Sequence, residues 1–509
     1  MFIKLHPNDN VAVSLGGEAS GGALDGCVAR EAIPAGHKMA LQDLLAGQAV
    51  VKYGYPIGVA KTNIAAGQHV HSHNLHTDLN REQANGTFQG LQVDKDSAGT
   101  ENQRTSLGRK KEKPLFQFSG WRRSDGRVAI RNEIWILNTV ACVNQTANQL
   151  AAWANRVLVG KVPHLDGVYT FNHPYGCSQL GEDLEHTRSI LTALARHPHA
   201  AGVLVLGLGC ENNQLQAQLD QIGPEYAEKI RAFSSQSVGD ELELGQKYLE
   251  ELATQLAQQP PELIDSDQLV LGMKCGGSDG LSGITGNPLL GRLADRHANS
   301  GGTVLLTEVP EMFGAESALF QRAVDEPTFQ AAHEMVAKFK DYFRSHNQPV
   351  SENPSPGNKD GGITTLEEKS LGCVQKGGNA PICSVVDYAQ QAAPALSGIA
   401  LVNGPGNDGV SITALTAAGA NVILFTTGRG TPMGAPVPTV KVATNSRLSE
   451  YKPGWIDFNA GTIAEGATLE DTADQLVGWL KGLANHELEA KNERNGYREI
   501  AIWKSGVTL

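Results

Sequence analysis

The 509-residue sequence lacks long apolar runs and blocks of basic residues. No stretch reaches the ~18 consecutive apolar residues that a membrane helix needs, and the chain does not open with a basic region followed by an apolar one. The 42 Lys and Arg residues are outnumbered by 54 Asp and Glu, and they form no cluster that would follow a phosphate backbone. We therefore expect a cytoplasmic protein without a membrane or nucleic-acid partner.

Cysteine pairs and complete nucleotide-binding motifs are also lacking. The seven cysteines are odd in number, far apart and without a CxxC pair, which favours reduced thiols over a disulfide framework. The stretch GLGCEN at 207–212 lacks the third glycine of a dinucleotide fingerprint, and GPGNDGVS at 404–411 has P-loop spacing without the lysine. The sequence therefore does not support an enzyme that transfers a hydride or a phosphoryl group with a bound nucleotide.

The pattern of the sequence changes along the chain, which is too long for a single hydrophobic core. The short phrases IPAG, LLAG and IAAG near the N-terminus predict a turn-rich β module. After a polar stretch, strand-like apolar runs end at glycine-containing loops and precede helical segments, which predicts an α/β fold with ligands at the strand ends. The predicted parts are a β domain over 1–80, a linker over 81–114, an α/β domain over 115–261 and an α/β catalytic domain over 262–509.

Three alternating histidines, His69, His71 and His73, form the sharpest local signal. In an extended strand their side chains share one face, where three imidazoles can hold a divalent metal and leave positions open for substrate. A histidine-rich surface strand is the alternative. His37 is expected either to support these ligands or to be structural.

A second signal is the turn HPYGC, which places His173 four residues before Cys177. The imidazole suits a general base or a metal ligand, and the thiolate suits iron, whereas a buried cysteine that acts as a small hydrophobe is the alternative. Cys142, Cys210 and Cys275 also lie at predicted strand ends, so a shared thiolate site or an iron–sulfur cluster stays open.

Two glycine-rich loops are candidates for holding an anion. The loop 353–362 contains Asn358 and Lys359, and the loop 426–431 places Arg429 between two glycines. Backbone amides together with these cations can bind a carboxylate. Plain surface loops are the alternative.

Taken together, the motifs resemble those of the altronate dehydratase and galactarate dehydratase family. The matching stretches run from the first domain to the last residue: GHKMAL, VVKYGYPIG, GQHVHSHN, NHPYGCSQLG, GLGCENN, CGGSDGLSGITGNP, TEVPEMFGAE, NPSPGNKDGGITTLEEKSLG, FTTGRGTP, VPTVKVATNS and KSGVTL. The HVHSHN string is similar to the altronate branch and departs from the galactarate branch, which leaves these histidines open to a role in substrate choice.

The resemblance implies a multidomain α/β fold, with a small N-terminal β-clip domain of the antifreeze-like (SAF) type followed by two α/β catalytic domains, in a homodimer. It implies a hydro-lyase that removes water from a sugar acid such as altronate and depends on Fe2+, with Mn2+ or another divalent metal as the alternative. Residue chemistry and motif position, rather than the resemblance, assign the individual roles. The predicted site consists of His71, His73, His69 and Cys177 as metal ligands, His173 and Glu211 as catalytic base and acid, and Arg429, Lys359, Asn358, Ser278 and Asp279 around the substrate.

Three rival interpretations remain at this point. A lyase of the same architecture acting on galactarate or another α-hydroxy acid would share every motif above. A sugar-acid-binding regulator would use the polar loops for binding alone. A redox iron–sulfur protein would use the cysteines at the strand ends.

Overall fold

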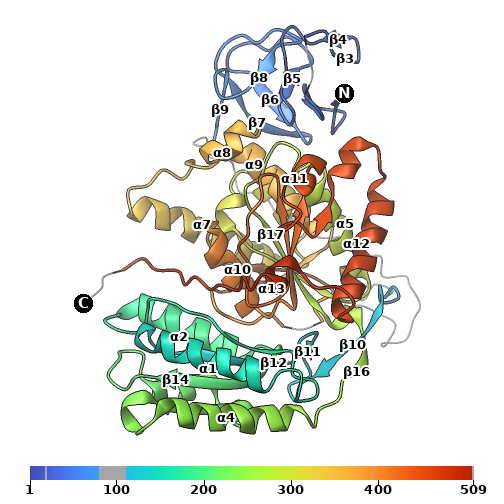
Figure 1. Ribbon diagram of the computed structural model, residues 1–509. Helices are drawn as coiled ribbons and strands as arrows, with labels where there is room; N and C mark the ends of the chain where they lie inside the picture. Colours follow the sequence, from blue (N-terminus) through green and yellow to red (C-terminus); the bar gives the residue numbers. More distant parts are fainter. Residues whose placement is uncertain (18–19, 80–110, 394, 507–509) are drawn as a thin grey trace.

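The computed structural model describes residues 1–17, 20–79, 111–393 and 395–506. Most of the predicted linker, 81–110, and the last three residues of the terminal KSGVTL motif lie outside the described residues. Three parts follow one another along the chain: a small β module, an α/β domain built on a four-stranded sheet and a larger α/β domain built on a seven-stranded sheet. The predicted fold class is thereby confirmed. In Figure 1 the β module lies at one end of the largest domain and the four-stranded domain lies at the other.

Short strands and tight turns build the β module. One sheet has the order β1-β2-β5-β8 and a second has the order β6-β7-β9, beside the hairpin β3-β4. The strands are β1 (Phe2–Ile3), β2 (Val11–Ser14), β3 (Ala23–Leu24), β4 (Cys27–Val28), β5 (Lys38–Ala40), β6 (Ala49–Lys52), β7 (Tyr55–Ala60), β8 (His69–Val70) and β9 (Leu75–His76).

The repeated phrase of the sequence explains how this module folds. Its first residue, Ile33, Leu44 or Ile64, is buried. Its last residue is a glycine with φ between 80° and 83° in all three copies, a left-handed conformation that favours glycine. Each copy therefore anchors an apolar side chain in the core and then reverses the chain.

The middle domain is a parallel sheet of order β13-β12-β14-β15, formed by β12 (Glu133–Asn138), β13 (Gly167–Thr170), β14 (Ala200–Gly207) and β15 (Ile230–Ser234). Its helices are α1 (Asn144–Val157), α2 (Gly181–Arg196), α3 (Leu215–Ile222) and α4 (Glu241–Leu256). One apolar core joins α1 and α4 to one face of the sheet. The other face, with α2, shares its core with the third domain. A small sheet, β11-β10-β16, of β10 (Gln117–Arg122), β11 (Val128–Ala129) and β16 (Glu262–Asp265), connects the two domains.

The third domain has a parallel sheet of order β19-β20-β18-β17-β21-β22-β23. Its strands are β17 (Val270–Cys275), β18 (Thr303–Leu306), β19 (Ile382–Val386), β20 (Gly398–Val402), β21 (Val422–Thr427), β22 (Thr439–Ala443) and β23 (Phe458–Asn459). Its helices are α5 (Gly286–Asn299), α6 (Glu316–Phe320), α7 (Glu326–Ser345), α8 (Pro356–Asp360), α9 (Leu366–Cys373), α10 (Asp408–Ala417), α11 (Ser446–Tyr451), α12 (Leu469–Ala484) and α13 (Lys491–Arg494). Across the described part of the chain, no helix is long and apolar enough to cross a membrane.

Candidate active site

Glycines let the β module pack closely against the loops that follow β17 and α8. A Cβ atom on Gly280 would lie 1.9 Å from the Gly36 carbonyl oxygen, and one on Gly362 would lie 2.4 Å from the same atom. The Gly280 amide also donates to the Gly361 carbonyl at 2.7 Å. Even a methyl group would clash with backbone at these positions. The glycines of the GHK, GGSDG and DGGI motifs therefore allow the backbones of the two domains to come into direct contact.

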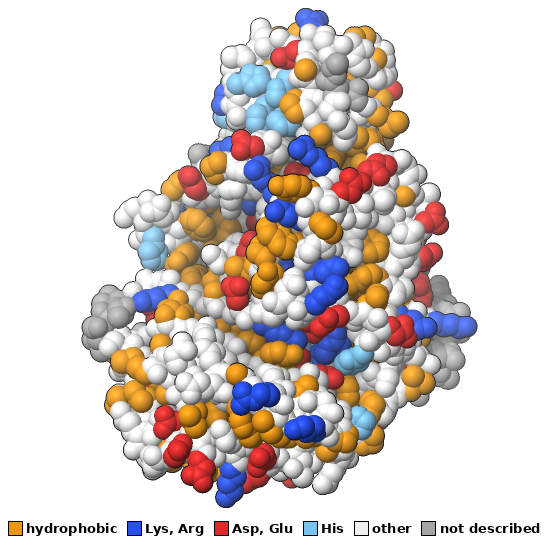
Figure 2. Space-filling view, in the orientation of Figure 1, with side chains coloured by type: hydrophobic (Ala, Val, Ile, Leu, Met, Phe, Trp, Pro, Cys, Tyr) orange, Lys and Arg blue, Asp and Glu red, His pale blue; other side chains and the backbone are white. Residues whose placement is uncertain are grey.

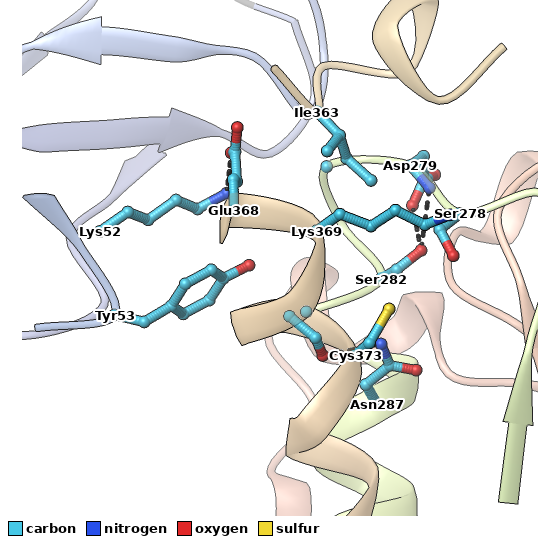
Figure 3. Close-up of a pocket in the computed structure, with 13 residues that line it drawn as sticks. Lys52, Tyr53, Ser278, Asp279, Ser282, Asn287, Ile363, Glu368, Lys369 and Cys373 are labelled. Carbon is cyan, nitrogen blue, oxygen red and sulfur yellow. Dashed lines mark hydrogen bonds and ion pairs between the residues drawn. The ribbon is translucent and has the colours of Figure 1, made fainter. Parts of the chain in front are cut away.

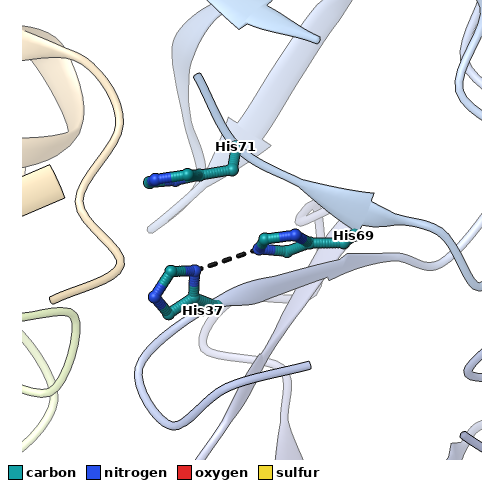
Figure 4. Close-up of side chains that lie close together, drawn as sticks. All are labelled: His37, His69 and His71. Atoms are coloured by element: carbon teal, nitrogen blue, oxygen red, sulfur yellow. Dashed lines mark hydrogen bonds between the residues drawn. The ribbon is translucent and has the colours of Figure 1, made fainter. Parts of the chain in front are cut away.

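Three histidines converge at this contact (Figure 4). His37 Nδ1 lies 3.0 Å from His69 Nε2, and the ring centroids of His37 and His71 are 4.9 Å apart. One ring nitrogen from each of these three side chains lies within 4.8 Å of the other two. Histidine side chains gather on the surface of the module above the largest domain (Figure 2); within the group His37 is buried, and His69 and His71 are partly buried.

His73 lies apart from this group, although the alternation of a strand predicted it there. It is exposed, and although its ring centroid is 5.6 Å from that of His69, its nitrogens are not among those that lie within 4.8 Å of one another. The reason is local: β8 ends at Val70, and the chain turns where the Asn74 amide donates to the His71 carbonyl. The structure brings His37 to the position that the strand pattern assigned to His73.

The three imidazoles are disposed to be neutral at physiological pH. Burial, followed by the repulsion of neighbouring imidazoles and Lys38, lowers the pKa of His69 and of His71 to about 4, and burial lowers the pKa of His37 as well. The backbone oxygen of Asp360 lies 3.3 Å from His37 Nε2, so a proton on that nitrogen leaves Nδ1 free as an electron-pair donor. Neutral imidazoles with oriented lone pairs are the ligands that Fe2+ and similar ions take.

A second cluster, Cys275, Cys373 and Glu311, fits a metal less well. The two Sγ atoms are 3.3 Å apart, and Glu311 Oε2 lies 2.9 Å from Cys373 Sγ. However, Lys376 Nζ lies 2.8 Å from Cys275 Sγ, and Lys369 Nζ lies 2.8 Å from Glu311 Oε1. Ammonium groups already supply the positive charge that a cation would bring, so a metal would have to displace them.

A small hollow opens between the module and α9 (Figure 3). Helix α9 begins after the Thr365 side chain, which caps it, and it carries Glu368 and Lys369 in its first turns. Lys369 extends toward Ser278 (Figure 3). The lining side chains are Lys52, Tyr53, Ser278, Asp279, Ser282, Asn287, Ile363, Glu368, Lys369 and Cys373. The wall thus combines ammonium, carboxylate and hydroxyl groups, which suits a polyhydroxy acid.

Glu368 connects the hollow to the histidine cluster. Its carboxylate lies between two buried lysines, with Lys38 Nζ at 2.8 Å and Lys52 Nζ at 2.9 Å. Lys38 also donates to Thr364 Oγ1 at 2.7 Å, and the same hydroxyl lies 3.2 Å from His71 Nδ1. Burial opposes ionisation of Glu368, but the two lysines outweigh it and lower the pKa to about 2. A continuous polar path therefore runs from His71 to the wall of the hollow.

Two of the five predicted substrate-binding residues, Ser278 and Asp279, line this hollow, and Asn358 contacts the Ser278 backbone. Asn358 Nδ2 donates to the Ser278 carbonyl at 2.8 Å, and Asp279 accepts from three neighbouring side chains. Arg429 is half exposed and donates to the Gly357 carbonyl at 3.0 Å. Lys359 lies in α8 and is partly exposed. The loops that the sequence singled out are therefore neighbours in space, while the roles of these residues stay predictions.

The structure places His173, Cys177 and Glu211 at the four-stranded sheet of the middle domain. His173 is buried, with Nε2 2.7 Å from the Asn138 carbonyl and Nδ1 accepting from the Tyr175 amide. The Glu211 carboxylate accepts from the Thr139 hydroxyl and from the Leu208 and Gly209 amides, whereas Cys177 is exposed. These side chains do not join the histidine cluster, and their catalytic or ligand roles stay predictions.

Sequence reasoning missed the buried charges of the site. Lys38 and Lys52 occur in largely apolar contexts, HKMAL and VVKYG, whereas Lys369 follows two glutamates in EEKSLG. A lysine inside a strand-like apolar run is a signal in itself, because lysine is almost never fully buried without a partner. That rule predicts a carboxylate partner for each buried lysine. In the structure Glu368 pairs with Lys38 and Lys52, and Glu311 pairs with Lys369.

The fold and the site together define a multidomain α/β enzyme in which a small β module completes a polar hollow. The comparisons with known proteins agree with this class. Residues 1–78 match the altronate/galactarate dehydratase SAF domain, residues 120–257 match the second domain of D-galactarate dehydratase/altronate hydrolase, and residues 266–508 match the C-terminal domain of D-galactarate/altronate dehydratase. The chain belongs to the altronate/galactarate dehydratase family.

Individual relatives extend over the whole chain. The chain is 45% identical to altronate dehydratase of Escherichia coli K12, with all of both chains covered. It is 44% identical to altronate dehydratase of Bacillus subtilis 168, over 100% of this chain and 99% of the other. Galactarate dehydratase (L-threo-forming) of Escherichia coli K12 is 33% identical over 99% and 96% of the two chains. The resemblance described from the sequence motifs is confirmed.

Proposed function

We propose that this protein is a hydro-lyase that removes water from D-altronate and gives 2-dehydro-3-deoxy-D-gluconate. The observation that carries the proposal is full-length similarity at 44–45% to two altronate dehydratases, against 33% to a galactarate dehydratase. The lysine-lined hollow supports it, because a sugar acid offers one carboxylate and several hydroxyls to such a wall.

The histidine cluster is the proposed metal site, with His37, His69 and His71 as ligands. The fit rests on the chemistry of the donors: three neutral imidazoles, of which His37 and His71 each have a further contact to an oxygen atom. A divalent ion bound there would supply Lewis acidity toward a carboxylate and its adjacent hydroxyl. The family relationship supports metal dependence in general, and we propose ferrous iron as the ion.

Residues of the hollow position the sugar acid in this proposal. Lys52 and Lys369 provide positive charge for the carboxylate, and the pKa of each lies above its ordinary value because a glutamate partner outweighs the effect of burial. The Ser278 and Asp279 side chains, on the loop after β17, face the same space and suit the sugar hydroxyls. The half-exposed Arg429 is placed at the rim, where an anion would first arrive.

The elimination needs a group that takes the C2 proton as the C3 hydroxyl leaves. The electrons of the C2–H bond form a C2–C3 double bond, the hydroxyl departs as water after gaining a proton, and the resulting enol becomes the 2-keto group. A base must lie within hydrogen-bond reach of the reacting carbon. Asp279 joins His173 as a candidate, because its carboxylate lines the hollow and burial raises its pKa.

Three further properties belong to the proposal. We propose a homodimer as the assembly, the cytoplasm as the compartment, and domain boundaries near residues 80, 114 and 261. The assembly and the compartment rest on the resemblance to the family.

An anaerobic assay tests the proposed function. Purified protein is supplied with altronate, galactarate or mannonate, each with Fe2+, with Mn2+ or after chelator treatment, and keto-acid formation is measured. We expect turnover of altronate with Fe2+ and none after chelation. Faster turnover of galactarate would move the protein to the other branch of the family, and full activity after chelation would overturn the metal site.

A further inference from the structure

Exposed thiols occur at a single place in the structure. Of the seven cysteines, Cys275 and Cys373 are buried and Cys27 and Cys383 are partly buried, while Cys142, Cys177 and Cys210 are exposed. A free cysteine ordinarily behaves as a small buried hydrophobe. All three exposed cysteines follow strands of the middle-domain sheet, and these strands, β12, β13 and β14, are parallel neighbours in the order β13-β12-β14. The carboxyl ends of parallel neighbours meet at one edge, so the three cysteine-bearing loops emerge together.

Direct bonds between residues beside the cysteines hold two of these loops together. The Ala141 amide, next to Cys142, donates to the Tyr175 carbonyl at 2.9 Å. Gly176, next to Cys177, has φ of 98°, and a Cβ atom there would lie 2.0 Å from the Thr139 carbonyl oxygen. The loops after β12 and β13 are therefore in backbone contact beside their cysteines.

The loop after β14 is attached to both of the others. The Asn213 amide donates to the Gly176 carbonyl at 3.0 Å, and the Ser178 amide donates to Asn212 Oδ1 at 2.8 Å. Glu211, next to Cys210, accepts from the Thr139 hydroxyl at 2.6 Å. Residues within three positions of each cysteine thus touch residues within three positions of the others, which holds the three cysteine-bearing loops together at one edge of the sheet.

Each cysteine-bearing loop leads into a helix of the middle domain. Helices α1, α2 and α3 begin at Asn144, Gly181 and Leu215, a few residues after each cysteine. The carboxylate of Glu211 is occupied by backbone amides and the Thr139 hydroxyl, so its charge is already satisfied.

A single metal ion does not match this arrangement. The three sulfur atoms do not all lie within 4.8 Å of one another, in contrast to the ligand atoms of the histidine cluster. A four-iron cluster holds its thiolate ligands farther apart than one ion does, because each sulfur binds a different iron. His173, four residues before Cys177, is unsuited as a further ligand where it stands, since both of its ring nitrogens are engaged.

We propose that Cys142, Cys177 and Cys210 bind an iron–sulfur cluster of the four-iron, four-sulfide kind, each thiolate holding one iron, with the fourth iron open to an oxygen ligand from solvent or a small acid. Transfer of a preassembled cluster exchanges three thiol protons for three sulfur–iron bonds and changes no oxidation state. This site is separate from the histidine cluster, so it does not rest on the function proposed above.

The test is analysis of iron, acid-labile sulfide and visible absorption in the full chain purified without oxygen. We expect about four sulfides per chain and a broad sulfide-to-iron absorption band. Cys142→Ser, Cys177→Ser and Cys210→Ser should each lose most of the sulfide and the band. Cys27→Ser, a matched change at a partly buried thiol of the β module, should keep both.

Two further results separate this site from the proposed metal site. His71→Ala should lose the iron of the histidine cluster but keep the labile sulfide together with the iron of the iron–sulfur cluster, because it changes the other site. Circular dichroism confirms that each serine variant is folded, so a lost cluster is not a lost fold. Wild-type protein that holds iron but no labile sulfide, even after reconstitution with iron and sulfide, would overturn the proposal, as would serine variants that keep the full band.

Discussion

Replacing Glu368 with Gln should destabilise the protein by about 3–5 kcal/mol at neutral pH, the usual cost of removing one partner from a buried ion pair. The carboxylate lies between Lys38 and Lys52, and all three side chains are at most 1% exposed. The fall of the Glu368 pKa from 4.5 to about 2, at about 1.4 kcal/mol per pKa unit, gives about 3 kcal/mol, in agreement with that range. Gln keeps the shape but leaves two buried ammonium groups without a counter-charge.

The loss should depend on pH in a defined direction. The Glu368 carboxylate stabilises the folded wild type fully above about pH 4.5, and this contribution disappears as pH falls toward 2. Burial lowers the pKa of Lys38 from 10.5 to about 8 even with Glu368 present. Without the carboxylate that pKa falls further, so the folded variant releases a proton more readily than the unfolded chain does. The variant should therefore recover part of its stability as pH rises toward 8 and above.

Urea unfolding of the full chain at several pH values measures both effects. Glu367→Gln is the matched control, because Glu367 is equally buried but its carboxylate accepts from Thr77 and the Asp78 amide instead of from lysine. It should cost about 0.5–1.5 kcal/mol, the net value of a hydrogen bond. Equal losses in the two variants, or a loss in Glu368→Gln that does not change with pH, would refute the reasoning.

Three other outcomes follow from the site. His71→Ala should lose turnover and the ion of the histidine cluster, whereas His73→Ala should keep that ion. Metal analysis of both folded variants checks this. Loss of that ion from both variants would favour the original prediction, in which His73 is a ligand. The pKa of His69 and of His71 is about 4, so their imidazoles stay neutral well below pH 6.5. The iron bound at the histidine cluster, measured after dialysis, should therefore be retained at pH 5.5 and be lost only as the pH approaches 4. Release of this iron near pH 6.5 would contradict the assignment. Gly280→Ala should detach the β module, seen as faster proteolysis and lost turnover, whereas Gly239→Ala, with open space around it, should change neither.

The fold class was predictable because its signals are local. Buried Ile33, Leu44 and Ile64 with their turn glycines define the module, and apolar strands that end in glycine-rich loops define the two parallel sheets. Each of these signals occupies only a few residues, so no knowledge of distant contacts is needed.

The candidate site was predictable only in part, because it forms through contacts between distant residues. His37 lies 323 residues from Asp360, whose backbone oxygen orients it, and Lys38 lies 330 residues from Glu368. No local sequence pattern indicates such distant partners. The early end of β8 likewise follows from the turn at Asn74 and not from the alternation of histidines. The sequence patterns therefore identified the loops of the site but not its buried lysine and glutamate side chains.

The pair His37 and Lys38 suggests why the ion site and the hollow occur at one interface. Successive side chains near a strand point to opposite sides, yet both of these residues contact the segment 360–368, because that segment wraps around the start of β5. His37 orients toward the ion site while Lys38 neutralises Glu368 at the wall of the hollow. A displacement of β5 must therefore disturb both at once. Ion binding by the three imidazoles should accordingly stabilise the docked module, since the ligands come from the module and their orienting oxygens come from the largest domain.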